Sequence, residues 1–141
     1  MTIARRDYNW VLRIRPQTAE LVQVRRFVEQ VAREAELQVE KIFDLKVAVS
    51  EAAANAMEHA CGEEASLEIE ARLESERLTF LVTDTGFFRP PCPPRDKLTN
   101  RGLGLPLMVA LMDEVSFSRA PGGGTRVSLS LLLDRPTQPV H

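Results

Sequence analysis

The sequence of 141 residues has few cysteines, no long apolar run and no surplus of either charge. Its two cysteines, Cys61 and Cys92, predict neither a disulfide framework nor a structural zinc site, so a reduced, cytoplasmic protein is expected. No stretch approaches the roughly 20 apolar residues of a membrane-spanning helix, and no apolar segment follows the N-terminus as in a signal peptide. The 18 basic residues nearly balance the 20 acidic ones, which argues against a dedicated nucleic-acid-binding protein.

What the sequence does contain fits one globular domain. The hydrophobic fraction of 44% is typical of a folded protein and too high for a disordered one. We expect a single domain with its core over residues 8–133 and a loose tail over residues 134–141.

Hydrophobic periodicity predicts a strand, two helices, two strands, a long loop, a helix and two strands. Thr18 is the expected cap of the first helix, whose apolar stripe begins at Leu21 and ends at Ala35. Because neighbouring strands adjoin in sequence and the helices come in groups, we expect an α+β two-layer sandwich, with helices on one face of a mainly antiparallel sheet. The remaining expected elements are strands at Tyr8–Arg15, Ser66–Glu74, Leu78–Asp84, Val115–Arg119 and Thr125–Leu133, and helices from Val39 to about Ala60 and at Leu105–Met112.

The long second helix carries Glu51, Asn55 and His59 at successive i+4 steps, in a segment otherwise rich in alanine. A carboxylate and a carboxamide one turn apart suit a hard cation together with a water or hydroxyl group. The amide oxygen is a ligand for Mg²⁺, and the carboxylate can accept a proton. A solvated edge of an amphipathic helix would explain the same stripe.

Asp84 ends a predicted strand and is followed, two residues later, by Gly86. An ionised carboxylate here could accept a hydrogen bond from the exocyclic amine of adenine, with Gly86 allowing a ligand close to the backbone. The alternative is a turn-forming Asp-x-Gly, which is common in hairpins.

Glycines also precede the last predicted helix, in the segment Arg101-Gly102-Leu103-Gly104-Leu105. Glycines before a helix expose backbone N–H groups to an anion, and the helix dipole adds to the attraction. The segment is neither a dinucleotide fingerprint nor a Walker loop, and a flexible connection to a core helix is the alternative. A second glycine run, Gly122–Thr125, predicts a hairpin turn.

In order and spacing, these elements together resemble the Bergerat-fold (GHKL) ATPases and, within them, the anti-sigma-factor serine/threonine kinases. The resemblance covers about Tyr8 to Leu133. The motifs that carry it are Glu51-x-x-x-Asn55, Asp84-x-Gly86, Gly102-x-Gly104 and Gly124-Thr125.

This resemblance implies an ATP site in which Asn55 binds Mg²⁺, Asp84 recognises adenine and Glu51 is the general base. The other residues that it places around the nucleotide are Gly86, Arg101, Gly102, Leu103, Gly104 and Thr125.

The implied function is that of a cytoplasmic protein serine/threonine kinase. It would transfer the γ-phosphoryl group of ATP to an anti-sigma-factor antagonist of the STAS type and would sequester a sigma factor. A homodimer is an option, and direct contact with nucleic acid or membrane is not expected. The alternative is a nucleotide-gated partner-binding switch without phosphotransfer, because Phe88 replaces a glycine found in many members and the loop Phe87–Asn100 is rich in proline.

Overall fold

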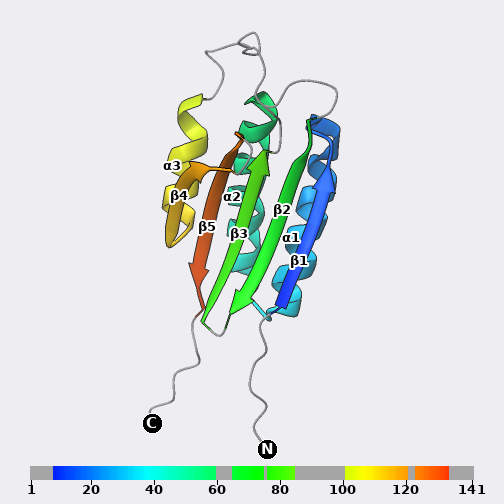
Figure 1. Cartoon of the computed structure of the whole chain (residues 1–141). Coiled ribbons are helices and arrows are strands. Elements are labelled where there is room, and N and C mark those ends of the chain that lie inside the picture. Colours follow the sequence, from blue (N-terminus) through cyan, green and yellow to red (C-terminus); the bar gives the residue numbers. More distant parts are fainter. Residues whose placement is uncertain (1–7, 60–64, 75, 85–100, 121–122, 134–141) are drawn as a thin grey trace, which may run out of the picture.

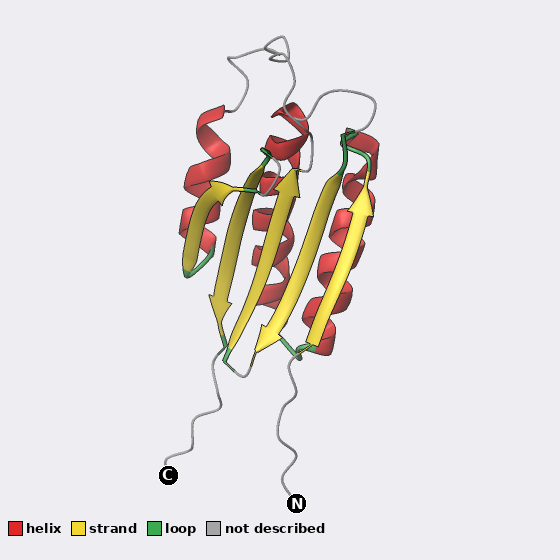
Figure 2. Ribbon diagram, viewed as in Figure 1, coloured by secondary structure: helices red, strands yellow, loops and turns green. Residues whose placement is uncertain are grey.

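A five-stranded sheet with helices packed on one face makes up the described part of the chain in the computed structural model (Figures 1 and 2). The structure describes residues 8–59, 65–74, 76–84, 101–120 and 123–133. The strand order is β1-β2-β3-β5-β4, and all four neighbouring pairs are antiparallel, which confirms the expected two-layer α+β architecture. The strands are β1 (Tyr8–Ile14), β2 (Leu67–Glu74), β3 (Arg77–Asp84), β4 (Glu114–Arg119) and β5 (Thr125–Leu132), and the helices are α1 (Leu21–Glu34), α2 (Val39–His59) and α3 (Arg101–Leu111).

The core lies between the helices and the inner face of the sheet. Alternate residues of β2 and β3 point inward, and the predicted stripe of α1 is buried against them. Phe27 of α1 meets Phe80 of β3 edge to face, with ring centroids 6.3 Å apart. From α2, the side chains of Ala48, Ala52 and Ala53 are wholly buried, and their small size lets the helix backbone lie close to the sheet.

The other face of the sheet is polar, as the alternation in residues 66–74 predicted. Glu68 and Glu70 of β2 lie there, and Glu68 pairs with Arg13 of β1. Near the middle of this face, the hydroxyl groups of Thr79 and Ser130 lie 2.9 Å apart. The sheet therefore contributes only one face to the core.

Two helix starts differ from the expectation. Thr18 does not cap α1: it begins a 3-10 turn, Thr18–Glu20, whose N-cap position is held by Gln17 without a side-chain hydrogen bond. Helix α3 begins at Arg101, four residues before the expected Leu105, so its two glycines lie inside the helix. Packing against α2 outweighs the low helix propensity of glycine here.

Pro106 lies inside α3, where it has no N–H for the helical ladder. The bond that it cannot make is the one to the carbonyl of Gly102, four residues earlier. No helix among the described residues is long and apolar enough to cross a membrane. The expected loop Phe87–Asn100, both cysteines and the tail 134–141 lie outside the described residues.

An ion-pair cluster joins the first two helices. The Lys46 ammonium group of α2 lies 2.8 Å from Glu29 Oε1 of α1, and the Arg33 guanidinium lies 2.7 Å from Glu29 Oε2. Hydrogen bonds from Lys46 and then Arg33 lower the pKa of Glu29 from 4.5 to about 2. The cluster therefore marks the side of α2 that faces α1.

Glu29→Gln is expected to lower the free energy of unfolding at neutral pH, because the depressed pKa means that folding favours the ionised carboxylate. This contribution is present above about pH 4.5 and is lost as the pH falls toward about 2, so the gap to the wild type should close over that window. Urea unfolding across pH measures it. Glu34→Gln, which removes a charge from α1 without breaking a described ion pair, is the control, and a pH-independent gap for Glu29→Gln would contradict the assignment.

The connection between α1 and α2 is closed by a Schellman motif. The N–H of Glu36 donates to the carbonyl of Arg33 at 2.9 Å, and the N–H of Leu37 donates to that of Ala32 at 3.1 Å. Glu36 itself has a φ of 63°, in the left-handed region that glycine usually occupies at this position. The chain thus accepts backbone strain at one residue to turn into α2.

Glu36→Gly is expected to raise the free energy of unfolding by up to about 1 kcal/mol, because relief of the left-handed strain exceeds the entropy that glycine adds to the unfolded chain. Urea unfolding at neutral pH is the measurement. Gln38→Gly, at the end of the same connection and without a positive φ, should give no gain. A Glu36→Gly protein no more stable than the wild type would show that the turn is unstrained.

Candidate functional site

Glu51 and Asn55 lie on the side of α2 that faces away from α1. The contact of Lys46 with Glu29 marks the side of α2 that meets α1. Asn55 comes nine residues after Lys46 and Glu51 five, which at about 100° per residue turns them by about 180° and 140°. Helix α3 packs against α2 on this other side (Figure 1).

Both side chains are half-buried. Within the described part of the chain, neither takes part in a hydrogen bond or an ion pair. The oxygens of Glu51 and Asn55 are therefore not used to hold the helix in place. His59 of the same stripe is the last residue of α2, and its side chain lies outside the description.

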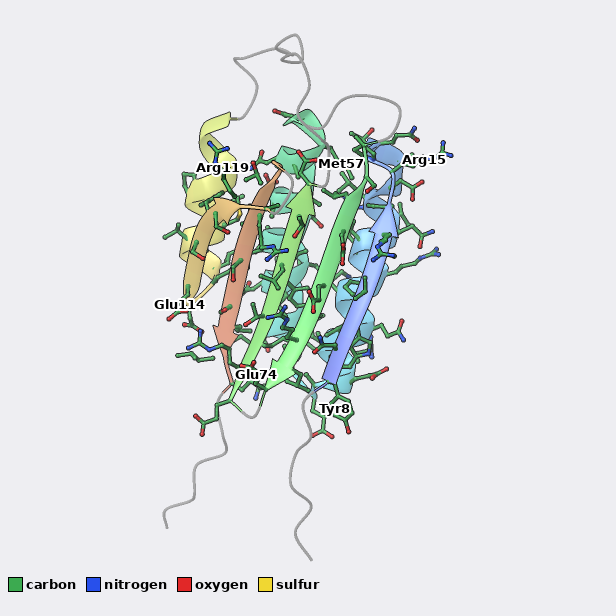
Figure 3. All side chains as sticks on the ribbon, viewed as in Figure 1. Tyr8, Arg15, Met57, Glu74, Glu114 and Arg119 are labelled. Carbon is green, nitrogen blue, oxygen red and sulfur yellow. The ribbon has the colours of Figure 1, made fainter. Side chains whose placement is uncertain are left out.

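Asp84 is the last residue of β3 and lies on the helix-covered face of the sheet. It follows Phe80 and Val82 at every second position, and its side chain is only 8% exposed. The end of β3 lies at the same end of the domain as the C-terminal half of α2 and the first turn of α3 (Figure 1). In Figure 3, Met57 of α2 and Arg119 of β4 mark this end, and Glu74 marks the other.

The start of β5 lies beside Asp84. The register pairs Thr83 with Arg126, so the exposed Thr125 is level with Asp84. Arg126 also donates from Nε to the Thr83 hydroxyl at 3.0 Å. One residue earlier, Gly124 lies so close to Asp84 that a Cβ on it would overlap with the Asp84 carbonyl oxygen. The glycine run in the sequence predicted a turn here, but not this contact.

The first turn of α3 supplies backbone N–H groups at the same end of the domain. Arg101, Gly102, Leu103 and Gly104 are all helical, and the first N–H groups of a helix have no partner within it. The side chains of Arg101 and Leu103 are outside the description, as is the whole of Gly86.

The donor set fits a hard, mostly hydrated cation better than a metal held by protein alone. The described residues contain no group of three or more His, Cys, Asp or Glu side chains that could hold a metal. The Asn55 amide oxygen, with the Glu51 carboxylate one turn before it, could provide one or two oxygen ligands. Mg²⁺ is commonly held in this way, with water and substrate phosphates completing its shell.

Similar proteins include bacterial regulators. The serine-protein kinase RsbW of Oceanobacillus iheyensis is 35% identical over 132 residues, covering 82% of this chain and 83% of that protein. RsbW of Bacillus subtilis is 38% identical over 97 residues, covering 59% of this chain and 61% of that protein. The anti-sigma F factor of Pasteuria penetrans is 30% identical over 102 residues, covering 64% of this chain and 68% of that protein.

The fold is also found in a solved structure. The crystal structure of the RsbU and RsbW domains of Rv1364c from Mycobacterium tuberculosis matches with a TM-score of 0.67 and 23% identity. The match covers 93% of this chain and 34% of that longer one. Residues 14–131 match the profile of the histidine kinase-like ATPase domain. The chain therefore belongs to the family of histidine kinase-like ATPase domains, as the motifs in its sequence predicted.

Proposed function

We propose that the chain is an ATP-dependent protein serine/threonine kinase that also acts as an anti-sigma factor. Its membership of an ATPase-domain family supports the use of ATP. The names of its relatives, serine-protein kinase RsbW and anti-sigma F factor, support both halves of the regulatory role. The protein that receives the phosphoryl group would be an anti-sigma-factor antagonist of the STAS type, and the sequestered protein a sigma factor.

One observation carries the catalytic half of this proposal. Glu51 and Asn55 share the side of α2 that faces α3, half-buried and without hydrogen bonds in the described part of the chain. Asp84 lies on the helix-covered face at the same end of the domain. A base and a cation ligand are groups that phosphoryl transfer uses, and a carboxylate at the same end of the domain could hold the adenine, which supports the proposal.

Each residue then has one task. Asp84 accepts a hydrogen bond from the adenine amine, with Thr125 beside it and Gly86 following it. The N–H groups in the turn from Arg101 to Gly104 face the phosphates, and the Asn55 oxygen would hold Mg²⁺. When bound, this ion would neutralise charge on the phosphate oxygens. Glu51 takes the proton from the serine hydroxyl of the antagonist as that oxygen attacks the γ-phosphorus and ADP leaves.

The remaining expectations follow from this role. We propose a cytoplasmic location, since a sigma factor is found with RNA polymerase there, and we keep the homodimer as part of the proposal. Neither nucleic acid nor a membrane is needed for either activity. The alternative function is a nucleotide-gated switch without phosphotransfer. It would use Asn55 and Asp84 in the same way but would give Glu51 no role as a base, so substitution of Glu51 separates the two functions.

Glu51→Gln is expected to lower the rate of phosphotransfer to a cognate antagonist by about 10²- to 10⁴-fold, because the amide cannot accept the proton. Its affinity for ATP should stay close to that of the wild type. Transfer is followed with γ-labelled ATP and binding by calorimetry. Glu40→Gln, in the first turn of α2 and exposed, is the matched control.

Undiminished transfer by Glu51→Gln would remove the base assignment. A wild-type chain that binds ATP and transfers nothing to any antagonist would instead favour the switch without phosphotransfer.

Asp84→Asn is expected to weaken ATP binding by about tenfold, because a neutral amide oxygen is a weaker acceptor for the adenine amine than an ionised carboxylate. GTP, which carries an oxo group at the position of the adenine amine, should bind weakly to the wild type. The side-chain amide that Asp84→Asn introduces can donate to this oxo group, so the preference for ATP over GTP should narrow in the variant. Calorimetry with the two nucleotides gives the comparison. Equal affinity for ATP and GTP in the wild type would speak against the adenine contact.

A further inference from the structure

Two adjacent glycines just before β5, Gly123 and Gly124, exclude a side chain for different reasons. Gly123 has a φ of 107°, which residues with a side chain rarely adopt. Gly124 does not have a positive φ. There, a side chain is excluded by lack of space. An ideal Cβ on it would overlap with the carbonyl oxygen of Asp84 and lie 2.8 Å from the carbonyl carbon and 3.7 Å from the Asp84 Cβ.

The segment that holds Gly124 is itself fixed. The N–H of Ala120 donates to the carbonyl of Gly124 at 2.7 Å, and the N–H of Gly123 donates to that of Ala120 at 3.1 Å. Ala120 is 5% exposed, so its methyl group is enclosed. A movement of Gly124 away from Asp84 would therefore strain or break the hydrogen bond from Ala120.

Strand β3 is also held one residue earlier, and on its other face. The Arg126 Nε donates to the Thr83 hydroxyl at 3.0 Å, and Thr83 faces away from the helices. Arg126 of β5 and Gly124 just before it thus contact the end of β3 at Thr83 and at Asp84. A Cβ at position 124 would have to displace the Asp84 peptide, since neither the turn nor the strand register leaves it room.

We infer that Gly124 is a positioning residue for Asp84 and so determines the preference for adenine. This inference rests on the proposed function, in which the Asp84 carboxylate accepts a hydrogen bond from the adenine amine. A hydrogen bond weakens steeply with distance and angle, so a shift of the Asp84 backbone by a bond length would remove it. Contacts with the phosphates, which the proposed function assigns to α2 and the first turn of α3, would remain.

The test compares ATP with purine riboside triphosphate, which lacks the exocyclic amine and is otherwise alike. Affinities are measured by calorimetry with Mg²⁺ on the full chain. The wild type should prefer ATP by about tenfold or more. Gly124→Ala should reduce this preference to about that of Asp84→Asn, while purine riboside triphosphate binds both variants as it binds the wild type.

Leu131→Ala is the matched control for lost stability. Leu131 is buried on the same strand, at the end opposite Gly124, and its truncation should lower the melting temperature and leave the preference for ATP intact. A purely structural role for Gly124 predicts the same behaviour for Gly124→Ala, and that result would overturn the inference.

If Gly124→Ala does not fold, Ala120→Gly tests the same contact more gently. It adds backbone freedom at the residue whose N–H donates to the Gly124 carbonyl and leaves Gly124 in place, so a partial loss of ATP preference is expected. Full preference in Ala120→Gly would overturn the inference. A wild-type chain without any preference would overturn the proposed role of Asp84 itself, an outcome distinct from a failure at Gly124.

Discussion

The close approach of α2 to the sheet is the constraint on which the arrangement depends. Three alanines of α2 are wholly buried at this contact: Ala48, Ala52 and Ala53. Each places only a methyl group between the helix and the strands. A core packed at crystal-like density cannot absorb a larger side chain without moving an element. Since Glu51 and Asn55 lie on the same helix, the thickness of this layer sets their height above the sheet on which Asp84 lies.

Height alone does not orient a helix, and α2 is also fixed in rotation. The ion pair of Lys46 with Glu29 lies on one side of α2, and Asn55 lies about half a turn round from it. An interaction at the surface, between two helices, therefore helps to decide which side chains face α3. Packing and electrostatics act together: the alanines set the distance to the sheet, and burial of Leu45 and Val49, supported by the α1 contact, sets the direction of the polar stripe.

Periodicity was enough to predict most of the fold. Alternation located β2 and β3, and the stripes on α1 and α2 identified their buried faces, because these patterns record which side of an element meets water. The start of α3 was not predictable in this way, since Gly102, Gly104 and Pro106 are poor helix residues that tertiary packing overrides. At Thr18, a good capping residue was available and the chain used a 3-10 turn instead.

The candidate site shows the same division. Glu51 and Asn55 could be found from their spacing, because one helix holds both of them. The contact of Gly124 with Asp84 joins residues 40 positions apart, and nothing in the local sequence records a distance between separate strands. A run of glycines signals a turn equally well whether the reason is a positive φ or a lack of space, so only coordinates distinguish Gly123 from Gly124.

Pro106 divides α3 into two parts with different resistance to opening. The carbonyl of Gly102 receives no hydrogen bond from position 106, because proline has no N–H. The turn that begins at Arg101 is therefore joined to the rest of the helix by one backbone hydrogen bond fewer. Local unfolding follows such weak points, and its free energy lies below that of global unfolding. The opening turn of α3 is thus the portion of the helix that amide exchange with solvent reaches first, while the stretch around the buried Met108 stays protected.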